Sequence, residues 1–325
     1  SRKISPKLLG CRKFNSIQID EKRALITKSS SKDLKILQEI NYYLNLPNNL
    51  KIYFPRLFEY KLGKTVSYTI EYYPYKTLSQ FFVMYKLPVD VWKFIFDKVF
   101  DIYEEFSSSK FGKPSVDSIK NVYLEKIYTR FSMLQSNREV FELTDYDQIV
   151  VNGTKYPGWK YYLEFITETI NDISKKSECQ IIHGDLCFSN ILFEPSTGII
   201  RFIDPRGEFY EEGIYGDFRY DIAKLLHSIH GKYDYIIHGM YTLNKINCKS
   251  YDFRTLESQL EYNIEKVFFN KLKQKYKSNE IREFLVLEAL LFLTMLPLHS
   301  DDEARQKCFY LIAIKILDQA INYKV

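Results

Sequence analysis

Polar side chains interrupt an apolar stretch in the middle of the sequence, at residues 181–193 (IIHGDLCFSNILF). This stretch contains His183, Asp185 and Asn190, and a further aspartate, Asp204, ends the apolar run that follows. Carboxylate and amide oxygens are hard ligands of the kind that Mg²⁺ prefers, and a carboxylate can also orient or deprotonate a hydroxyl group. The pattern therefore predicts a centre for phosphoryl transfer, built from a loop aspartate, an asparagine that closes the loop and a second aspartate across a hairpin.

Each of these residues taken alone is more typical of a turn, because Asp and Asn side chains commonly cap turns. The predicted secondary structure around these residues favours a functional role over a turn cap. Residues 190–194 (NILFE) and 199–204 (IIRFID) are short apolar runs, and the turn residues 195–198 (PSTG) between them predict a hairpin. Residues 217–230 (DFRYDIAKLLHSIH) have helical periodicity. The sequence thus predicts a loop, a hairpin and a helix in succession, an order that can hold the polar residues together.

The first 75 residues predict a small sheet with one helix. Strand-like runs lie at 14–19, 23–29, 56–63 and 65–73, and residues 31–47 have helical spacing that ends at a proline. Pro74 breaks this pattern, and Thr77 is the candidate N-cap of the next helix. Helical spacing then dominates, at 88–107, 115–137 and 158–176 and in three further helices expected over 252–322. We therefore expect an α+β chain in two parts, 1–75 and 77–325, joined near 71–76.

Charge and cysteine usage exclude several classes of protein. The 46 basic and 41 acidic side chains give a net charge of +5, which is too small to indicate nucleic-acid binding. The five cysteines are an odd number without a CxxC pair, so neither a disulfide framework nor a zinc site is expected, and a reducing cytoplasm fits best. No signal peptide is recognised at the start. The longest apolar run, 284–298, contains Glu288 and is too short to span a bilayer, so no transmembrane segment is expected.

The spacing of His183, Asp185 and Asn190, with Asp204 further on, matches the catalytic pattern of protein kinases. The variant with Gly184 between His and Asp resembles the small-molecule kinase superfamily of aminoglycoside phosphotransferases and choline kinases. The segments HGDLCFSNILF, IIRFIDPRG and GDFRYDIAKLL occur in the order and spacing of that family. The resemblance implies a two-lobed protein-kinase-like fold. Its N-terminal lobe would be a small antiparallel β-sheet with one main helix, and its larger, mostly helical C-terminal lobe would carry a catalytic loop and a β-hairpin within 181–207.

The resemblance also implies a role for each residue of the motif. Asp185 would be the catalytic base or the carboxylate that orients the acceptor hydroxyl. Asn190 and Asp204 would bind Mg²⁺. His183 would brace the loop, and Asp221 would anchor it through backbone hydrogen bonds from the start of its helix.

The nucleotide would be held by the first part of the chain. Lys28, at the end of a strand, would hold the α- and β-phosphates, and Glu39 in the next helix would position it. Lys28 by itself would more often be an edge-strand lysine. The backbone of Tyr72 and Tyr73 in the hinge would pair with adenine, and the turn around Gly10 would cover the phosphates.

These observations predict an ATP- and Mg²⁺-dependent kinase that phosphorylates a hydroxyl group of a small molecule. Sugars, amino alcohols such as choline, aminoglycosides and precursors of bacterial surface polysaccharide lie within the family's reach. Pro205 and Arg206 after Asp204, and the absence of an A-P-E segment, argue against a protein kinase. A catalytically inactive, pseudokinase-type binding module is the other alternative, although it would need no complete set of Asp185, Asn190 and Asp204.

Two features of the sequence allow more than one role in binding the acceptor. Arg206 either contacts the phosphates or an anionic group of the acceptor, or forms an ion pair with a glutamate at 208, 211 or 212. Residues 149–162 (IVVNGTKYPGWKYY) contain glycines and a proline that break helices, and form either an acceptor-binding loop or a packed connector.

Overall fold

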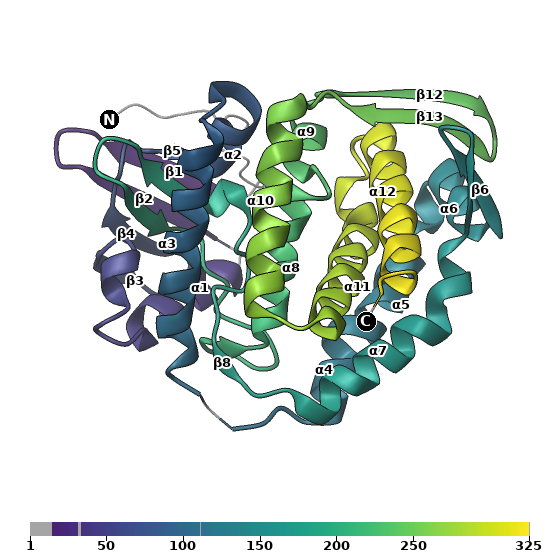
Figure 1. The fold of residues 1–325 in the computed structure, drawn as a ribbon. Helices are drawn as coiled ribbons and strands as arrows, with labels where there is room; N and C mark the ends of the chain where they lie inside the picture. Colours follow the sequence, from purple (N-terminus) through teal and green to yellow (C-terminus); the bar gives the residue numbers. More distant parts are fainter. Residues whose placement is uncertain (1–14, 32–33, 111, 325) are drawn as a thin grey trace.

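The N-terminal part of the molecule is an antiparallel sheet that carries one long helix (Figure 1). The computed structural model describes residues 15–31, 34–110 and 112–324, so the predicted phosphate-covering turn around Gly10 lies outside the described residues. The strands pair in the order β1-β2-β4-β3, and α1 follows β2 in the chain. Their bounds are β1 (Asn15–Asp20), β2 (Leu25–Ser30), α1 (Leu34–Asn45), β3 (Leu57–Lys61) and β4 (Val66–Glu71).

A short extended segment links this sheet to the rest of the chain. After β4 the chain passes Pro74 and enters β5 (Lys76–Thr77), which pairs with β9 of a second sheet. Thr77 then caps α2 (Leu78–Gln80) through a reciprocal capping box with Gln80, which confirms the predicted N-cap. A π-helical turn (Phe81–Tyr85) leads into α3 (Val89–Ser107).

The predicted loop and hairpin form the structural centre of the C-terminal part. The three-stranded sheet has the order β10-β9-β5, and β8 pairs with β11. Gly198 in the β9–β10 turn has φ 70°, a left-handed conformation that glycine adopts at little cost. The bounds are β8 (Gln180–Ile181), β9 (Ile191–Glu194), β10 (Ile199–Phe202) and β11 (Tyr215–Gly216).

Helices surround this centre, as the spacing predicted. α11 is buried on nearly all sides, which explains its long apolar run, and no helix among the described residues is long and apolar enough to cross a membrane. The helices are α4 (Val116–Lys120), α5 (Lys126–Ser132), α6 (Arg138–Asp145), α7 (Leu163–Lys176), α8 (Phe218–Ile229), α9 (Tyr233–Ile237), α10 (Gln259–Lys275), α11 (Ser278–Met295) and α12 (Glu303–Ile321).

A four-stranded sheet at the far end of the molecule was not predicted. It has the order β12-β13-β6-β7 and lies beside α12 and α6 (Figure 1). The segment expected as an acceptor-binding loop or a packed connector contains the hairpin β6–β7, with Asn152 and Gly153 both at positive φ in its turn. An Asn-Gly pair between alternating residues is a strong hairpin signal. The strands are β6 (Gln148–Val151), β7 (Thr154–Pro157), β12 (Tyr241–Asn247) and β13 (Ser250–Thr255).

Candidate active site

The loop between β8 and β9 is fixed to α8 by one buried carboxylate. Asp221 accepts hydrogen bonds from the backbone N–H groups of His183 (2.6 Å) and Gly184 (2.9 Å). The hydroxyl of Tyr103 on α3 donates a third (2.8 Å). Asp221 is fully buried, and burial raises its pKa to about 7 in spite of these three donors. This is the geometry expected of a loop anchor.

His183 braces the loop from within. Its Nδ1 accepts a hydrogen bond from the backbone N–H of Asp185 (3.2 Å), so its Nε2 carries the proton and donates to the carbonyl of Ile203 (2.9 Å). Burial lowers the pKa of His183 to about 4, so the ring is neutral at pH 7. The ring also stacks on Phe54, with 6.1 Å between ring centres. The histidine therefore ties the start of the loop to the end of β10.

The carboxylate of Asp185 lies between an amide and an ammonium group. The side-chain amide of Asn190 donates to the backbone carbonyl of Asp185 (2.8 Å) and to its Oδ2 (3.2 Å). Lys224 on α8 forms an ion pair with Oδ1 at 2.9 Å. Burial acts to raise the pKa of Asp185, but Lys224 and the nearby Lys35 outweigh it and hold that pKa below its usual range. Asp185 is therefore ionised at neutral pH.

Asp204 is in direct contact with the N-terminal sheet. Lys28 of β2 forms an ion pair with its Oδ1, and the same ammonium lies 3.7 Å from Oε2 of Glu39 on α1. Glu39 is held in turn by the hydroxyl of Tyr68. Burial acts to raise the pKa of Asp204, but Lys28 and Lys35 lower it below the usual range. Residues 176 positions apart thus meet in one charged cluster.

The donor set fits a magnesium ion bound together with a nucleotide. Among the described residues no three His, Cys, Asp or Glu side chains cluster as a metal cage. Mg²⁺ is usually held by one or two carboxylates plus substrate phosphates and water, not by a cage of protein ligands. Asp204 and Asn190 supply this pattern. The side-chain nitrogen of Asn190 donates within the loop, and no described residue donates a hydrogen bond to its side-chain oxygen, which can therefore act as a metal ligand.

The structure bears on two further expectations, the pairing of adenine with the hinge backbone and the position of Arg206. The N–H of Tyr72 donates to the carbonyl of Ala24 (2.8 Å), so it is engaged within the sheet and the expectation of adenine pairing narrows to its carbonyl and to Tyr73. The side chain of Tyr73 lies under Arg201, 5.2 Å from ring centre to guanidinium. Arg206 lies against Gly184: a Cβ at that glycine would lie 2.8 Å from the Cβ of Arg206.

Sequence reasoning missed two residues of the site. Lys224 pairs with Asp185, and Tyr103 donates to Asp221. Lys224 follows Asp221 by three positions on the same helix, so the i,i+3 spacing was a usable signal. Tyr103 lies 118 positions away from Asp221, and no sequence pattern indicates that contact.

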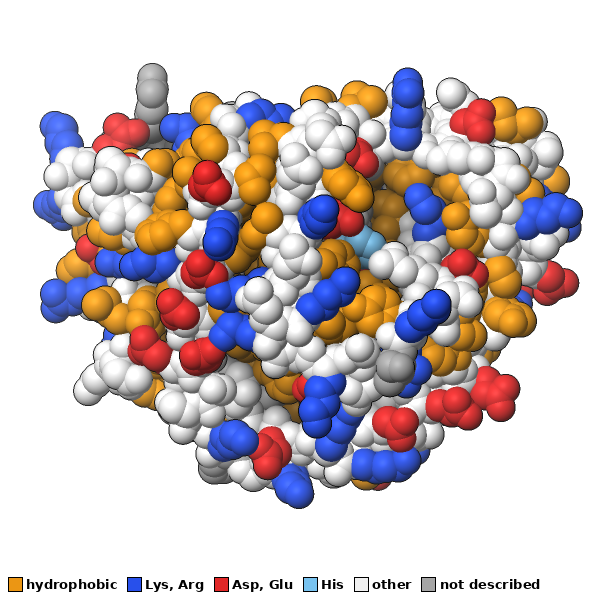
Figure 2. All heavy atoms as spheres, viewed as in Figure 1, with side chains coloured by type: hydrophobic (Ala, Val, Ile, Leu, Met, Phe, Trp, Pro, Cys, Tyr) orange, Lys and Arg blue, Asp and Glu red, His pale blue; other side chains and the backbone are white. Residues whose placement is uncertain are grey.

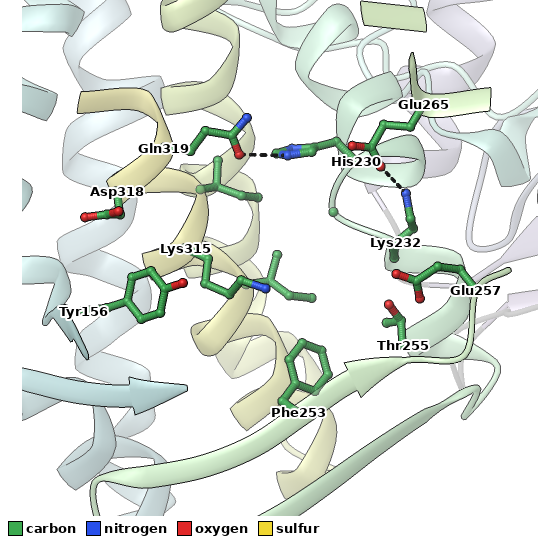
Figure 3. Close-up of a pocket in the computed structure, with 13 residues that line it drawn as sticks. Tyr156, His230, Lys232, Phe253, Thr255, Glu257, Glu265, Lys315, Asp318 and Gln319 are labelled. Carbon is green, nitrogen blue, oxygen red and sulfur yellow. Dashed lines mark hydrogen bonds and ion pairs between the residues drawn. The ribbon is translucent and has the colours of Figure 1, made fainter. Parts of the chain in front are cut away.

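A cavity of about 390 Å³ lies apart from these residues. It opens on the face that Figure 2 shows hollowed, between α10, β13 and α12. Figure 3 shows His230, Lys232, Glu265 and Lys315 around it, with Lys232 paired to Glu265. None of the predicted site residues lines it, so the residues of the catalytic motif do not converge there.

Comparison with known proteins identifies the fold. No protein-family model matches the sequence, and no curated protein is significantly similar to it. Among solved structures, a thermostable mutant of the aminoglycoside phosphotransferase APH(4)-Ia, in a ternary complex with AMP-PNP and hygromycin B, has a TM-score of 0.59 at 12% identity, covering 99% of this chain and 94% of that one. A putative aminoglycoside phosphotransferase from Ralstonia eutropha JMP134 has a TM-score of 0.50 at 10% identity, covering 96% and 90%. The chain therefore has the two-lobed, protein-kinase-like fold of aminoglycoside phosphotransferases, as the motifs predicted.

Proposed function

We propose that this protein is an ATP- and Mg²⁺-dependent phosphotransferase that phosphorylates a hydroxyl group of a small molecule. The observation that carries the proposal is the grouping of Asp185, Asn190 and Asp204. The side chain of Asn190 bonds Asp185, its carbonyl accepts from the N–H of Ile203 beside Asp204, and Lys28, next to Glu39, pairs with Asp204 from the N-terminal part. The fold supports the same conclusion. Residues 15–71 would then hold the nucleotide, and the C-terminal part would hold the acceptor.

The charge of each of these residues suggests its role in the proposed reaction. Lys28, positioned by Glu39, would neutralise the phosphates of ATP, and Mg²⁺ held by Asp204 and Asn190 would stabilise the charge that develops on them. Asp185 would hydrogen-bond the acceptor hydroxyl and aim its oxygen at the γ-phosphorus. As the new P–O bond forms, the bond from the γ-phosphorus to the β,γ-bridging oxygen breaks, and ADP leaves with the electron pair.

The low pKa of Asp185 bears on its role in this reaction. A carboxylate held ionised by Lys224 is a weak base, so it orients the hydroxyl well but takes its proton only late. This suits a loose transition state, in which the attacking oxygen has little bond to phosphorus when the leaving group departs. Asp185 therefore acts chiefly as an orienting group and receives the proton as the transfer is completed.

An ATP-consumption screen tests the proposal. Sugars, amino alcohols and aminoglycosides would be supplied as acceptors to the unchanged protein, to Asp185→Asn and to Asp172→Asn, an exposed aspartate on α7 that serves as the matched control. We expect at least one acceptor to raise turnover, with Asp185→Asn reducing it by about 10²-fold or more and Asp172→Asn leaving it unchanged. If no acceptor raised turnover above that of Asp185→Asn, the proposed activity would be wrong.

The same variants separate an enzyme from an inactive binding module. We expect Mg²⁺ with ATP to raise the melting temperature by several degrees more than ATP in chelator, because ligand binding to the folded state stabilises it. Asp204→Asn should lose that metal-dependent increment. A melting temperature indifferent to Mg²⁺, together with absent turnover, would favour the pseudokinase-type module.

A further inference from the structure

Three cationic side chains from separate parts of the chain lie beside Asp185, beside its neighbour Gly184 and beside Tyr220 on α8. Lys224 on α8 is paired with its carboxylate at 2.9 Å. One turn earlier on α8, the ring of Tyr220 lies 6.0 Å from the ammonium of Lys126 on α5. Arg206 packs against Gly184, the residue before Asp185. Lys126, Arg206 and Lys224, called the cationic cluster below, come from the C-terminal part and not from the sheet that bears Lys28.

Two members of the cationic cluster have no carboxylate partner in the part of the chain that the structure describes. Across the described residues, no carboxylate lies within 4.0 Å of Lys126 or Arg206. The alternative ion pair of Arg206 with a nearby glutamate is therefore not formed, and Glu208 instead accepts a hydrogen bond from Gln38 on α1. The acids of the segment before α12 are also occupied, because Asp301 and Asp302 both pair with Arg305.

The directions of the pKa shifts of Tyr220 and Lys126 agree with an excess of positive charge beside them. Tyr220 is almost fully buried, and burial acts to raise its pKa, yet Lys126, Lys224 and Arg206 lower it overall. Tyr220 acts to raise the pKa of Lys126, but burial and the neighbouring Arg206 and Lys224 lower it. A partly buried excess of positive charge costs free energy unless an anion pairs with it.

We infer that the cationic cluster binds an anionic acceptor, a hydroxylated small molecule that carries a carboxylate or phosphate group near the hydroxyl presented to Asp185. The inference rests on the proposed function and names its substrate class. The planar guanidinium of Arg206 suits two-pronged binding of a carboxylate or phosphate, and Lys126 adds a point charge. Lys224 stays with Asp185 and the transferred phosphoryl group. A polycationic aminoglycoside would meet like charge here and be rejected.

Paired acceptors that differ in charge test the inference. Glucose and glucuronate form one pair, and glycerol and glycerate another; each would be assayed with the unchanged protein, Lys126→Gln, Arg206→Gln and Lys273→Gln. Lys273 is exposed on α10 and is the matched control. We expect kcat/KM about tenfold or more higher for the acid of a pair, and a KM for that acid about tenfold higher in Lys126→Gln and Arg206→Gln, with the KM for ATP unchanged.

A binding measurement decides the inference even if none of these acids is a substrate. Inorganic phosphate would be titrated calorimetrically into protein saturated with AMP-PNP and Mg²⁺. We expect phosphate to bind about tenfold or more weakly to Lys126→Gln and Arg206→Gln than to the unchanged protein and Lys273→Gln. Equal phosphate binding by all four proteins, or preferred turnover of the neutral or cationic acceptors, would overturn the inference while leaving the proposed function intact. Absence of any turnover above Asp185→Asn would overturn the proposed function, with phosphate binding still deciding whether the cluster takes an anion.

Discussion

Replacing Asp221 by asparagine should loosen the catalytic loop without changing the size of the side chain. Asp221 receives two backbone N–H groups and the Tyr103 hydroxyl, all at 2.6–2.9 Å, in a fully buried place. An asparagine oxygen at the Oδ2 position keeps His183 and Tyr103 as donors, but its NH₂ group then faces the N–H of Gly184. One buried N–H is left unsatisfied at about 1–3 kcal/mol, and in the ionised fraction of Asp221 two charge-assisted bonds also become neutral ones.

We therefore expect Asp221→Asn to lower the free energy of unfolding by about 2–4 kcal/mol. Tyr103→Phe, which removes only one of the three bonds, should cost about 1 kcal/mol. A catalytic group displaced by about 1 Å can lower the rate by about 10²-fold, so kcat should fall by at least about tenfold in Asp221→Asn. Urea unfolding and steady-state kinetics measure both effects, with the exposed Asp172→Asn as control.

The pH dependence of the same variant tests the electrostatics. Burial raises the pKa of Asp221 to about 7, so the folded protein binds this proton more tightly than the unfolded chain does. The contribution of this group to stability is then present at low pH and is lost as the pH rises from about 4 to about 7. The difference in stability between the unchanged protein and Asp221→Asn should be larger at pH 5 than at pH 8. A difference below about 0.5 kcal/mol at both pH values, with unchanged kcat, would refute the anchoring role; a larger difference at pH 8 would show that the hydrogen bonds outweigh burial.

Three further perturbations test other parts of the structure. In Gly207→Ala the new methyl would lie 1.9 Å from the carbonyl oxygen of Gln38, so the urea midpoint should fall by an amount equivalent to about 2–3 kcal/mol, and an unchanged midpoint would contradict this packing. His227 is buried between aromatic rings, and burial holds its pKa well below the usual value, so stability is lost as the pH falls below about 6.5. In His227→Phe the loss of stability between pH 7 and pH 5 should shrink by up to about 2 kcal/mol, and equal losses in urea titrations at the two pH values would exclude this histidine as a cause. Glu39→Gln should lower kcat/KM for ATP by about tenfold or more, because Lys28 loses its positioning partner; kinetics identical to the unchanged protein would exclude that role.

Local patterns in the sequence were sufficient for much of the fold. The periodicity at 31–47 and 88–107 produced α1 and α3, because a helix that buries one face must repeat its apolar residues every three to four positions. The turn at 195–198 produced the β9–β10 hairpin. The β6–β7 hairpin was missed although Asn152-Gly153 signalled its turn, because the helix-breaking glycines and proline around it were interpreted as a loop or a connector.

The parallel pairing of β13 with β6 could not have been predicted from local sequence. It joins residues about a hundred positions apart, in a sheet whose strand β7 packs against α12. Contacts of this kind depend on how whole elements dock, not on the residues that flank each strand.

The sequence by itself predicted which residues would carry the proposed chemistry: a short loop contains Asp185 and Asn190, a hairpin places Asp204, and each of these spacings is set by local backbone geometry. Only the tertiary structure decided the charges around them. Lys28 on β2 reaches Asp204 from the N-terminal sheet, and Lys126 on α5 reaches the ring of Tyr220, one turn before Lys224 on α8. Electrostatic interactions depend on distance in space and on burial, so the inferred preference for an anionic acceptor could be argued only from the folded arrangement of these helices.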